Sequence, residues 1–168
     1  MATSNGTVKK VGLENFSRRR SSGLIAIELD EGNRLVGVSI TDGEQDIMLF
    51  TSEGKANRFN EGDVRAMGRT ARGVRGMNLP EGVELISLIV PVEGGQILTA
   101  SANGYGKRTL VTEYSTKGRG GKGMIAMRTS ERNGDLIGAV QVADSDEIML
   151  ISNKGTLVRT RIAEIGLQ

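Results

Sequence analysis

A glycine-centred turn returns about every fifty residues, and this internal repeat constrains the fold more than any other feature of the sequence. The turn glycines are Gly6, Gly54, Gly104 and Gly155, at spacings of 48, 50 and 51 residues. Each follows an apolar segment and precedes a β-branched or basic run. The repeat divides the chain into three nearly complete units and part of a fourth, at about 1–46, 47–96, 97–147 and 148–168.

Apolar segments keep the phase of the repeat. Ile47–Phe50 matches Gln96–Thr99 and Ile148–Ile151, each just before its glycine turn. Later in the unit, Leu35–Ile40 has counterparts at 85–90 and 136–140. Equivalent residues should therefore occupy equivalent places in successive structural units.

Each unit is predicted to form two β-hairpins. The first has glycine second in a two-residue turn, which favours type I′ because that turn needs positive φ. The second pairs Gly23–Leu29 with Leu35–Ile40 and turns near 31–33. Four short strands per repeat of this length are typical of a propeller blade. We therefore predict a single all-β domain over 1–168, a propeller of four-stranded blades that could be an open partial disc; a β-sandwich or β-solenoid has the same strand count.

Charge is sorted within every repeat although the net charge is only +2. The first parts, residues 1–23, 47–76, 97–123 and 148–168, together carry +13, and the remaining segments carry −11. Because a repeated fold places equivalent loops on one part of the surface, the basic segments should form a continuous positive band. Such a band on a nearly neutral protein indicates a polyanion site; the alternative is a mixed-charge surface that only maintains solubility.

The basic loops have features suited to phosphate binding. Lys117–Gly123 is glycine-rich, so its backbone can approach a phosphate closely. Aromatic residues are isolated, which argues against stacking on unpaired bases and favours duplex DNA bound through its backbone. A protein-interaction propeller with an acidic partner is the alternative function. The predicted DNA-binding residues are Lys9, Lys10, Arg18, Arg19, Arg20, Arg58, Arg65, Arg69, Arg72, Arg75, Lys107, Arg108, Lys117, Arg119, Lys122, Arg159 and Arg161.

The residue inventory argues against several other classes. Cysteine and histidine are both absent, which removes Cys–His nucleophiles, the usual zinc sites and disulfide frameworks. Gly118–Gly123 lacks the Gly-Lys-Ser/Thr ending of a nucleotide-binding loop. We expect no catalytic constellation, no cofactor and no small-molecule substrate. No apolar run is long enough for a membrane span, and the first residues do not resemble a signal peptide, so a cytoplasmic location is expected.

The whole chain resembles the C-terminal domain of the DNA gyrase A subunit. The resemblance is carried by Ile47–Phe59, Val64–Gly68, Gly73–Gly76, Asn103–Thr109 with Glu113-Tyr114, and Gly155–Ile162. It implies a β-pinwheel, in which neighbouring blades exchange strands, that wraps duplex DNA around a basic perimeter. The parent topoisomerase uses ATP to introduce negative supercoils, with the rest of gyrase A and the gyrase B subunit supplying cleavage and ATP hydrolysis near the bacterial nucleoid.

Two departures from the family pattern affect these expectations. The family domain usually has about six blades, so three repeats and a piece indicate a fragment. The family's wrapping motif is a Gln-Arg-Arg-Gly-Gly-Lys-Gly box in the first blade. Here Lys117–Gly123 resembles it in a later repeat but lacks the opening Gln and one Arg. We therefore expect a degenerate copy of the box.

Overall fold

The computed structural model describes all residues, 1–168, as short β-strands joined by loops and by four 3-10 turns. The strands are β1 (Ala2–Thr3), β2 (Thr7–Val8), β3 (Leu35–Gly37), β4 (Asp46–Thr51), β5 (Lys55–Asn60), β6 (Val74–Arg75), β7 (Leu85–Ile89), β8 (Gln96–Ser101), β9 (Gly106–Leu110), β10 (Met124–Ile125), β11 (Leu136–Val142), β12 (Glu147–Ile151) and β13 (Leu157–Arg161). The 3-10 turns are η1 (Leu13–Phe16), η2 (Glu61–Asp63), η3 (Val111–Glu113) and η4 (Ile162–Glu164). The prediction of an all-β fold is confirmed.

Each blade is built on the hairpin around its turn glycine. The hairpins are β1–β2, β4–β5, β8–β9 and β12–β13, all antiparallel. In the first three repeats a later strand of the same repeat pairs with the first hairpin strand, as β7 does with β4 and β11 with β8. These hairpins confirm the first half of the predicted unit.

The predicted second hairpin is wrong, because its two arms join different sheets. β6 lies in the second repeat but pairs with β2 of the first, and β10 lies in the third repeat but pairs with β5 of the second. The outermost strand of a blade therefore comes from the next repeat, which is the strand exchange that the resemblance implied. An alternating apolar pattern identifies a strand but not its partner, so the sequence alone favoured the nearer pairing.

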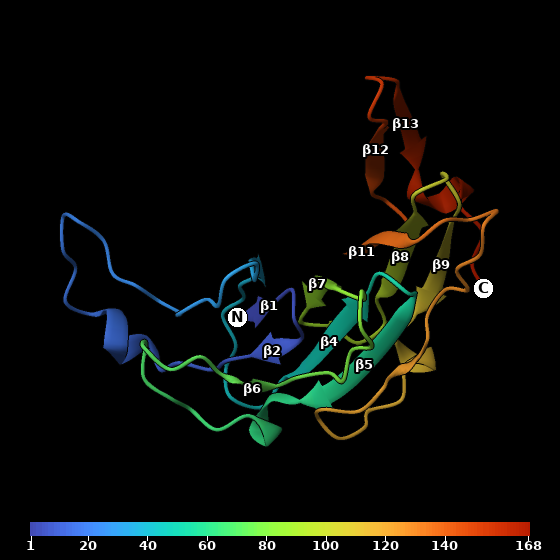
Figure 1. Ribbon diagram of the computed structural model, residues 1–168. Coiled ribbons are helices and arrows are strands. Elements are labelled where there is room, and N and C mark those ends of the chain that lie inside the picture. The colour runs from blue at the N-terminus through green and yellow to red at the C-terminus, as the bar shows by residue number, and fades with distance from the viewer.

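The blades follow one another in an open arc (Figure 1). Blades one and two have four strands, in the orders β3-β1-β2-β6 and β10-β5-β4-β7. Blade three has three strands and blade four only the β12–β13 hairpin. The segment 24–25, which corresponds to β6 and β10, forms no strand and lies in an extended loop. The sheets do not close into a ring.

The hairpin turns differ from the predicted type I′. The amide of Gly54 donates to the carbonyl of Thr51 at 3.0 Å, so Ser52 and Glu53 are the central residues. Neither has positive φ, whereas Gly54 has φ of 82°. A turn followed by a left-handed glycine is the three-residue hairpin loop. The glycine was correctly identified as the conformational requirement, but its position in the turn was not.

The register of the hairpins also corrects the predicted alignment of the apolar segments. Ile47 pairs with Phe59, Ile97 with Thr109 and Ile148 with Thr160, so Ile47 corresponds to Ile97. The predicted alignment sets Gln96 opposite Ile47, one residue out of phase. Because successive strand residues face opposite sides of a sheet, a shift of one exchanges the faces.

The hydrophobic core consists of separate layers between neighbouring blades. The layer between blades two and three includes Met48, Phe50, Val111 and Tyr114, all buried. The Phe50 and Tyr114 rings meet edge-on with centroids 5.9 Å apart. Smaller clusters form the layer between blades one and two and that between blades three and four. Blade-to-blade packing of this kind holds equivalent loops in a fixed spatial order.

Candidate nucleic-acid interface

Three basic loops occupy equivalent places in the first three repeats, at residues 17–23, 65–73 and 115–123; we call them the rim loops. The second and third lead from a 3-10 turn to an exchanged strand, β6 or β10, which is the outermost strand of its sheet. They therefore lie at the outer perimeter, and Figure 1 shows both along the lower edge of the molecule. The second and third basic loops thus lie beside the outer strands of their sheets, whereas no strand directly follows the first.

Arg119, in the third rim loop, bonds to the two residues that flank the second rim loop. Its Nε donates to the carbonyl of Asp63 at 3.0 Å, and its Nη1 donates to the carbonyl of Arg75 at 2.5 Å. The amide of Gly120 adds a bond to the carbonyl of Gly76 at 2.8 Å. Loops from two repeats are thereby held edge to edge.

Four further cations gather around this junction and remain exposed. With Arg119 they form what we call the rim cluster: Arg65, Arg75, Lys117, Arg119 and Lys122. No ion pair of the structure includes any of them. Because their charges are not neutralised by carboxylates, they create a positive potential that reaches into solvent.

The backbone of the third rim loop is open to an incoming anion. Gly118 and Gly121 are exposed, and a Cβ built on Gly118 would meet nothing within 4 Å. The lysines at 117 and 122 flank this bare stretch. Backbone N–H groups and lysine side chains can together contact phosphate oxygens without reading base sequence.

The second rim loop contributes two cations that are partly engaged. Arg69 donates from Nη1 to the carbonyl of Ile25 at 2.9 Å. Arg72 pairs with Asp30 at 2.6 Å and with Glu28 at 3.8 Å, yet its side chain remains 63% exposed. Exposed ion pairs of this kind are weak, so a polyanion can compete for Arg72.

Three predicted DNA-binding residues instead link blades. They share one place in the repeat, four residues after the turn glycine, and are Lys10, Arg58 and Arg108; we call them the latch residues. Lys10 Nζ donates to the carbonyl of Glu61 at 2.9 Å, and Arg108 Nε to that of Ile165 at 2.7 Å. Arg58 Nη1 reaches the carbonyls of Val111 and Tyr114 at 3.2 and 3.3 Å. In each case the cation caps a 3-10 turn of the next blade.

Carboxylates hold the Arg58 latch in place. Asp46 accepts from Arg58 Nε at 2.8 Å and from Thr116 Oγ1 at 2.9 Å, and Glu93 accepts from Arg58 Nη2 at 2.7 Å. Burial disfavours the charged forms, but the hydrogen bonds outweigh it: they lower the pKa of Asp46 and raise that of Arg58. This network joins two repeats.

Lys9 is also buried, with its ammonium group donating to the carbonyls of Ala26 and Arg69. Burial, and secondly the charge of Arg69, lower the pKa of Lys9. In this structure Lys9, like the latch residues, is turned away from the solvent that a duplex would occupy.

The other predicted residues lie outside the rim cluster. Arg18, Arg19 and Arg20 are exposed in the first rim loop, and Lys107 is half-buried on β9. Arg159 and Arg161 lie on β13, where both pair with Glu147.

The linking role of the latch residues was missed, although the sequence contained a signal for it. An acid or amide stands twelve residues before three of the cations at this position, as in the pairs Asp46/Arg58 and Gln96/Arg108. On a hairpin this spacing brings the two side chains together across the strands.

Two further observations concern metal-ligating residues and membrane-spanning helices. No three acidic, histidine or cysteine residues gather in a group that could hold a metal ion. The structure also contains no helix of the length and hydrophobicity needed to cross a bilayer.

Comparison with known proteins identifies relatives over nearly the whole chain. The DNA gyrase A subunit of Pseudomonas aeruginosa is 60% identical over 167 residues, and that of Escherichia coli K12 is 56% identical. Both alignments cover 99% of this chain but only 18% and 19% of those proteins. The chain thus spans about a fifth of the length of these relatives, in agreement with the expected fragment.

Solved structures give the same assignment. The C-terminal domain of DNA topoisomerase IV superposes with a TM-score of 0.92 at 32% identity, covering 99% of this chain and 53% of that one. The gyrase A C-terminal domain superposes with a TM-score of 0.86 at 28% identity, covering 99% of this chain and 56% of that one. The sequence pattern of the family described as DNA gyrase C-terminal domain, beta-propeller, matches residues 1–42, 45–91, 95–143 and 146–168. With its blades, exchanged strands and basic rim loops, the chain belongs to the DNA gyrase C-terminal domain family of β-propellers.

Proposed function

We propose that this chain is a non-catalytic module that binds duplex DNA along its outer rim with little sequence preference. The observation that carries the proposal is the rim cluster, in which Arg119 links the third rim loop to both ends of the second while the surrounding cations stay outside every ion pair. Family membership supports the assignment.

A rim of this kind favours bent DNA. Successive blades turn the surface, so a duplex that follows several rim loops must curve with the arc. Phosphate contacts and the release of counterions can offset a bending cost of a few kcal/mol. DNA wrapping by the module is therefore the expected mode of binding.

The alternative, a propeller that docks an acidic protein, has less support. The rim cluster has no feature that would select a protein as its partner. The exposed glycine backbone of the third rim loop suits a regularly spaced row of phosphates. A propeller that only docks a protein should not bind duplex DNA at physiological salt.

Charge removal on the third rim loop tests the proposal. Lys117→Gln with Lys122→Gln should weaken binding to unrelated duplex sequences alike, because phosphate contacts carry no base information. The slope of log K against log salt should flatten by roughly 0.9 for each phosphate contact that the substitutions remove, or about 1.8 in total. Fluorescence anisotropy across a salt series measures both effects.

A control variant that loses the same two positive charges elsewhere separates an effect of the rim loops from an effect of net charge. Arg128 and Lys154 are exposed cations outside the rim loops, and Arg128→Gln with Lys154→Gln should leave the slope nearly unchanged. Equally weakened binding in the two double variants would contradict a localised rim site.

The setting of the module is part of the same proposal. We place it within DNA gyrase, a type II topoisomerase, where it would support ATP-dependent negative supercoiling. Cleavage and ATP hydrolysis would come from the remainder of gyrase A and from gyrase B. The names of the bacterial relatives support this setting, and with it a location in the cytoplasm at the nucleoid.

A further inference from the structure

One arginine of the third rim loop spans the base of the second. Arg119 Nε donates at 3.0 Å to the carbonyl of Asp63, which ends η2 just before the second rim loop. Its Nη1 donates at 2.5 Å to the carbonyl of Arg75, which lies in β6 just after that loop. A single guanidinium therefore fixes the distance between the two ends of the second rim loop.

The same place in each rim loop holds an arginine. Arg19, Arg69 and Arg119 follow one another at intervals of 50 residues. Arg69 Nη1 donates to the carbonyl of Ile25 at 2.9 Å, and Ile25 stands 50 residues before Arg75. Arg69 and Arg119 thus make the same bond, each to the residue two positions beyond the preceding rim loop.

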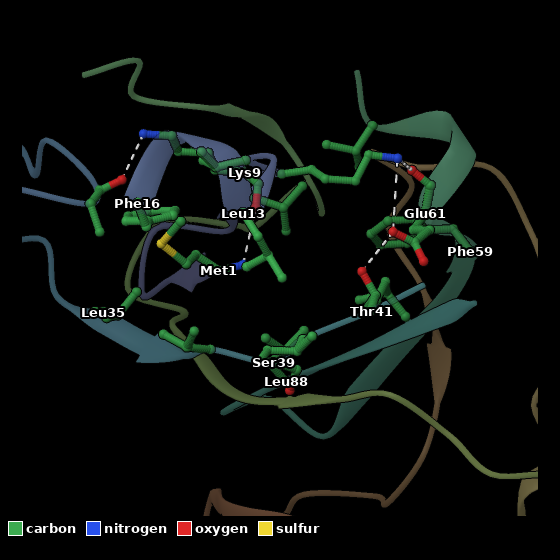
Figure 2. A pocket seen from close by; sticks show the side chains of 18 residues that line it. Met1, Lys9, Leu13, Phe16, Leu35, Ser39, Thr41, Phe59, Glu61 and Leu88 are labelled. Atoms are coloured by element: carbon green, nitrogen blue, oxygen red, sulfur yellow. Dashed lines mark hydrogen bonds and ion pairs between the residues drawn. The ribbon is translucent and has the colours of Figure 1, made fainter. Parts of the chain in front are cut away.

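A hairpin side chain adds a second link at each of these junctions. Lys9 and Asn57 both lie three residues after a turn glycine. The ammonium group of Lys9 donates to the carbonyl of Ala26 at 2.9 Å (Figure 2) and also to that of Arg69. Asn57 Nδ2 donates to the carbonyl of Gly118 at 3.3 Å. The position of each of these two rim loops therefore depends on side chains of a neighbouring repeat.

Arg119 differs from the other cations of the rim cluster in its contacts. It is half-buried, whereas Arg65, Lys117 and Lys122 are exposed. Two of its three guanidinium nitrogens donate to carbonyls. A planar guanidinium holds two acceptors at a fixed spacing, whereas an ammonium is a point charge on a flexible stem. The residue type required at this position is therefore set by geometry as well as by charge.

The loop that Arg119 spans carries two of the cations assigned to DNA binding. Arg65 is exposed at its start, and the side chain of Arg72, near its end, is 63% exposed. A loop whose ends can move samples many conformations and loses that freedom when it binds a partner. A loop with a fixed base avoids part of this entropic cost.

We propose that Arg119 is a positioning residue, which orders the second rim loop so that Arg65 and Arg72 contact phosphates of the same duplex. It acts through the loop and not as a phosphate ligand. Arg69 has the corresponding role for the segment that follows the first rim loop. This inference rests on the proposed DNA binding, and it adds that a rim loop is arranged by an arginine of the next repeat.

A substitution that conserves charge separates position from charge. Arg119→Lys keeps the positive charge but loses the fork, so we expect duplex affinity to fall roughly tenfold, nearly as far as in Arg119→Gln. Arg65→Lys makes the same change at an exposed arginine of the rim cluster. It should weaken binding much less, because lysine also binds phosphate. Fluorescence anisotropy with one duplex at fixed salt compares the three variants.

Hydrogen exchange in the absence of DNA tests the loop itself. The amides of Met67 and Ala71 donate to backbone carbonyls at 2.9 and 3.2 Å. Both amides should exchange several-fold faster in Arg119→Lys and Arg119→Gln than in the parent chain, because the base of the loop is released. Exchange in β7 should stay unchanged, which distinguishes a local opening from a loss of global stability.

Two results would overturn the proposal. The first is parent-like affinity in Arg119→Lys together with a large loss in Arg119→Gln, since Arg119 would then be an ordinary phosphate ligand. The second is unchanged exchange of Met67 and Ala71 in both variants. A parent chain that binds no duplex DNA would contradict the proposed function, whereas the exchange measurement by itself still decides whether Arg119 orders the loop.

Discussion

Gly54 and Gly104 occupy the same place in their hairpins but face different surroundings. Both have positive φ, 82° and 83°. At Gly54 the exchanged strand region of the next repeat passes so close that a Cβ would lie 2.0 Å from the carbonyl oxygen of Met127. At Gly104 a Cβ would meet nothing within 4 Å, because blade three receives no exchanged strand. Substitutions at these two glycines can therefore separate the cost of backbone strain from the cost of a clash between blades.

Alanine at these two glycines should therefore have unequal effects. Gly104→Ala is expected to lower the free energy of unfolding by about 1 kcal/mol, since it adds only left-handed strain. Gly54→Ala must also displace Met127 and should cost roughly 3 kcal/mol. Chemical denaturation of both variants measures the difference; equal destabilisation would mean that the docking of β10 contributes little to stability.

At the scale of elements, the latch residues fasten each hairpin to the 3-10 turn of the next blade. Arg58 has a side chain only 11% exposed and contacts Asp46, Glu93 and two carbonyls of the next blade. Arg159 holds the same place in the fourth repeat, but its side chain is 69% exposed and pairs only with Glu147. Arg58 is thus buried by the blade that packs against it, and Arg159 has no such neighbour among the described residues.

Arg58→Met should destabilise the chain far more than Arg159→Met. The first substitution removes a buried cation together with its bonds to Asp46, Glu93 and two turn carbonyls of the next blade, which is expected to cost about 2–3 kcal/mol. The second removes one exposed ion pair, worth about 0.5 kcal/mol or less. Urea unfolding monitored by circular dichroism compares them. If DNA affinity fell in Arg58→Met while stability held, the latch assignment would be incorrect.

Acid should weaken the same link. The pKa of Asp46 is lowered in the folded chain, so its contribution to stability is full above its unfolded pKa and is lost as pH falls through the folded value. The stability gap between the parent chain and Asp46→Asn should therefore be widest near neutral pH and shrink below about pH 4. Thermal midpoints of both proteins from about pH 7 to about pH 3 measure this gap; a constant gap would show that the charge of Asp46 is not responsible.

The whole molecule is an arc whose blades are each completed by the following repeat. Local signals predicted the hairpins correctly, because the turn glycine and the flanking apolar run both lie within one segment. The partners of β6 and β10 could not be predicted from the residues, since a two-residue strand has no pattern that distinguishes a near sheet from a far one. Only the family resemblance implied the exchange.

The candidate site, too, was only partly predictable from the sequence. Periodic charge located the rim loops, and the exposed cations Arg65, Arg75, Lys117 and Lys122 lie there or directly beside them. The periodic charge could not distinguish these exposed cations from Lys9, Arg58 and Arg108, which follow the same pattern in the sequence. In the structure those three side chains donate to carbonyls inside the fold. Solvent exposure depends on where the next blade packs, and that information is not local.

Strand exchange also separates the unit that is repeated in the sequence from the unit that folds. A gene segment cut at the repeat boundaries would encode a hairpin, an inner strand and the outer strand of another sheet, so it could not fold as a complete blade. Lineages that gain or lose one repeat must consequently re-form the junctions on both sides of the change. Blade number should then evolve in steps that preserve the interface sequences rather than by simple insertion of self-sufficient modules.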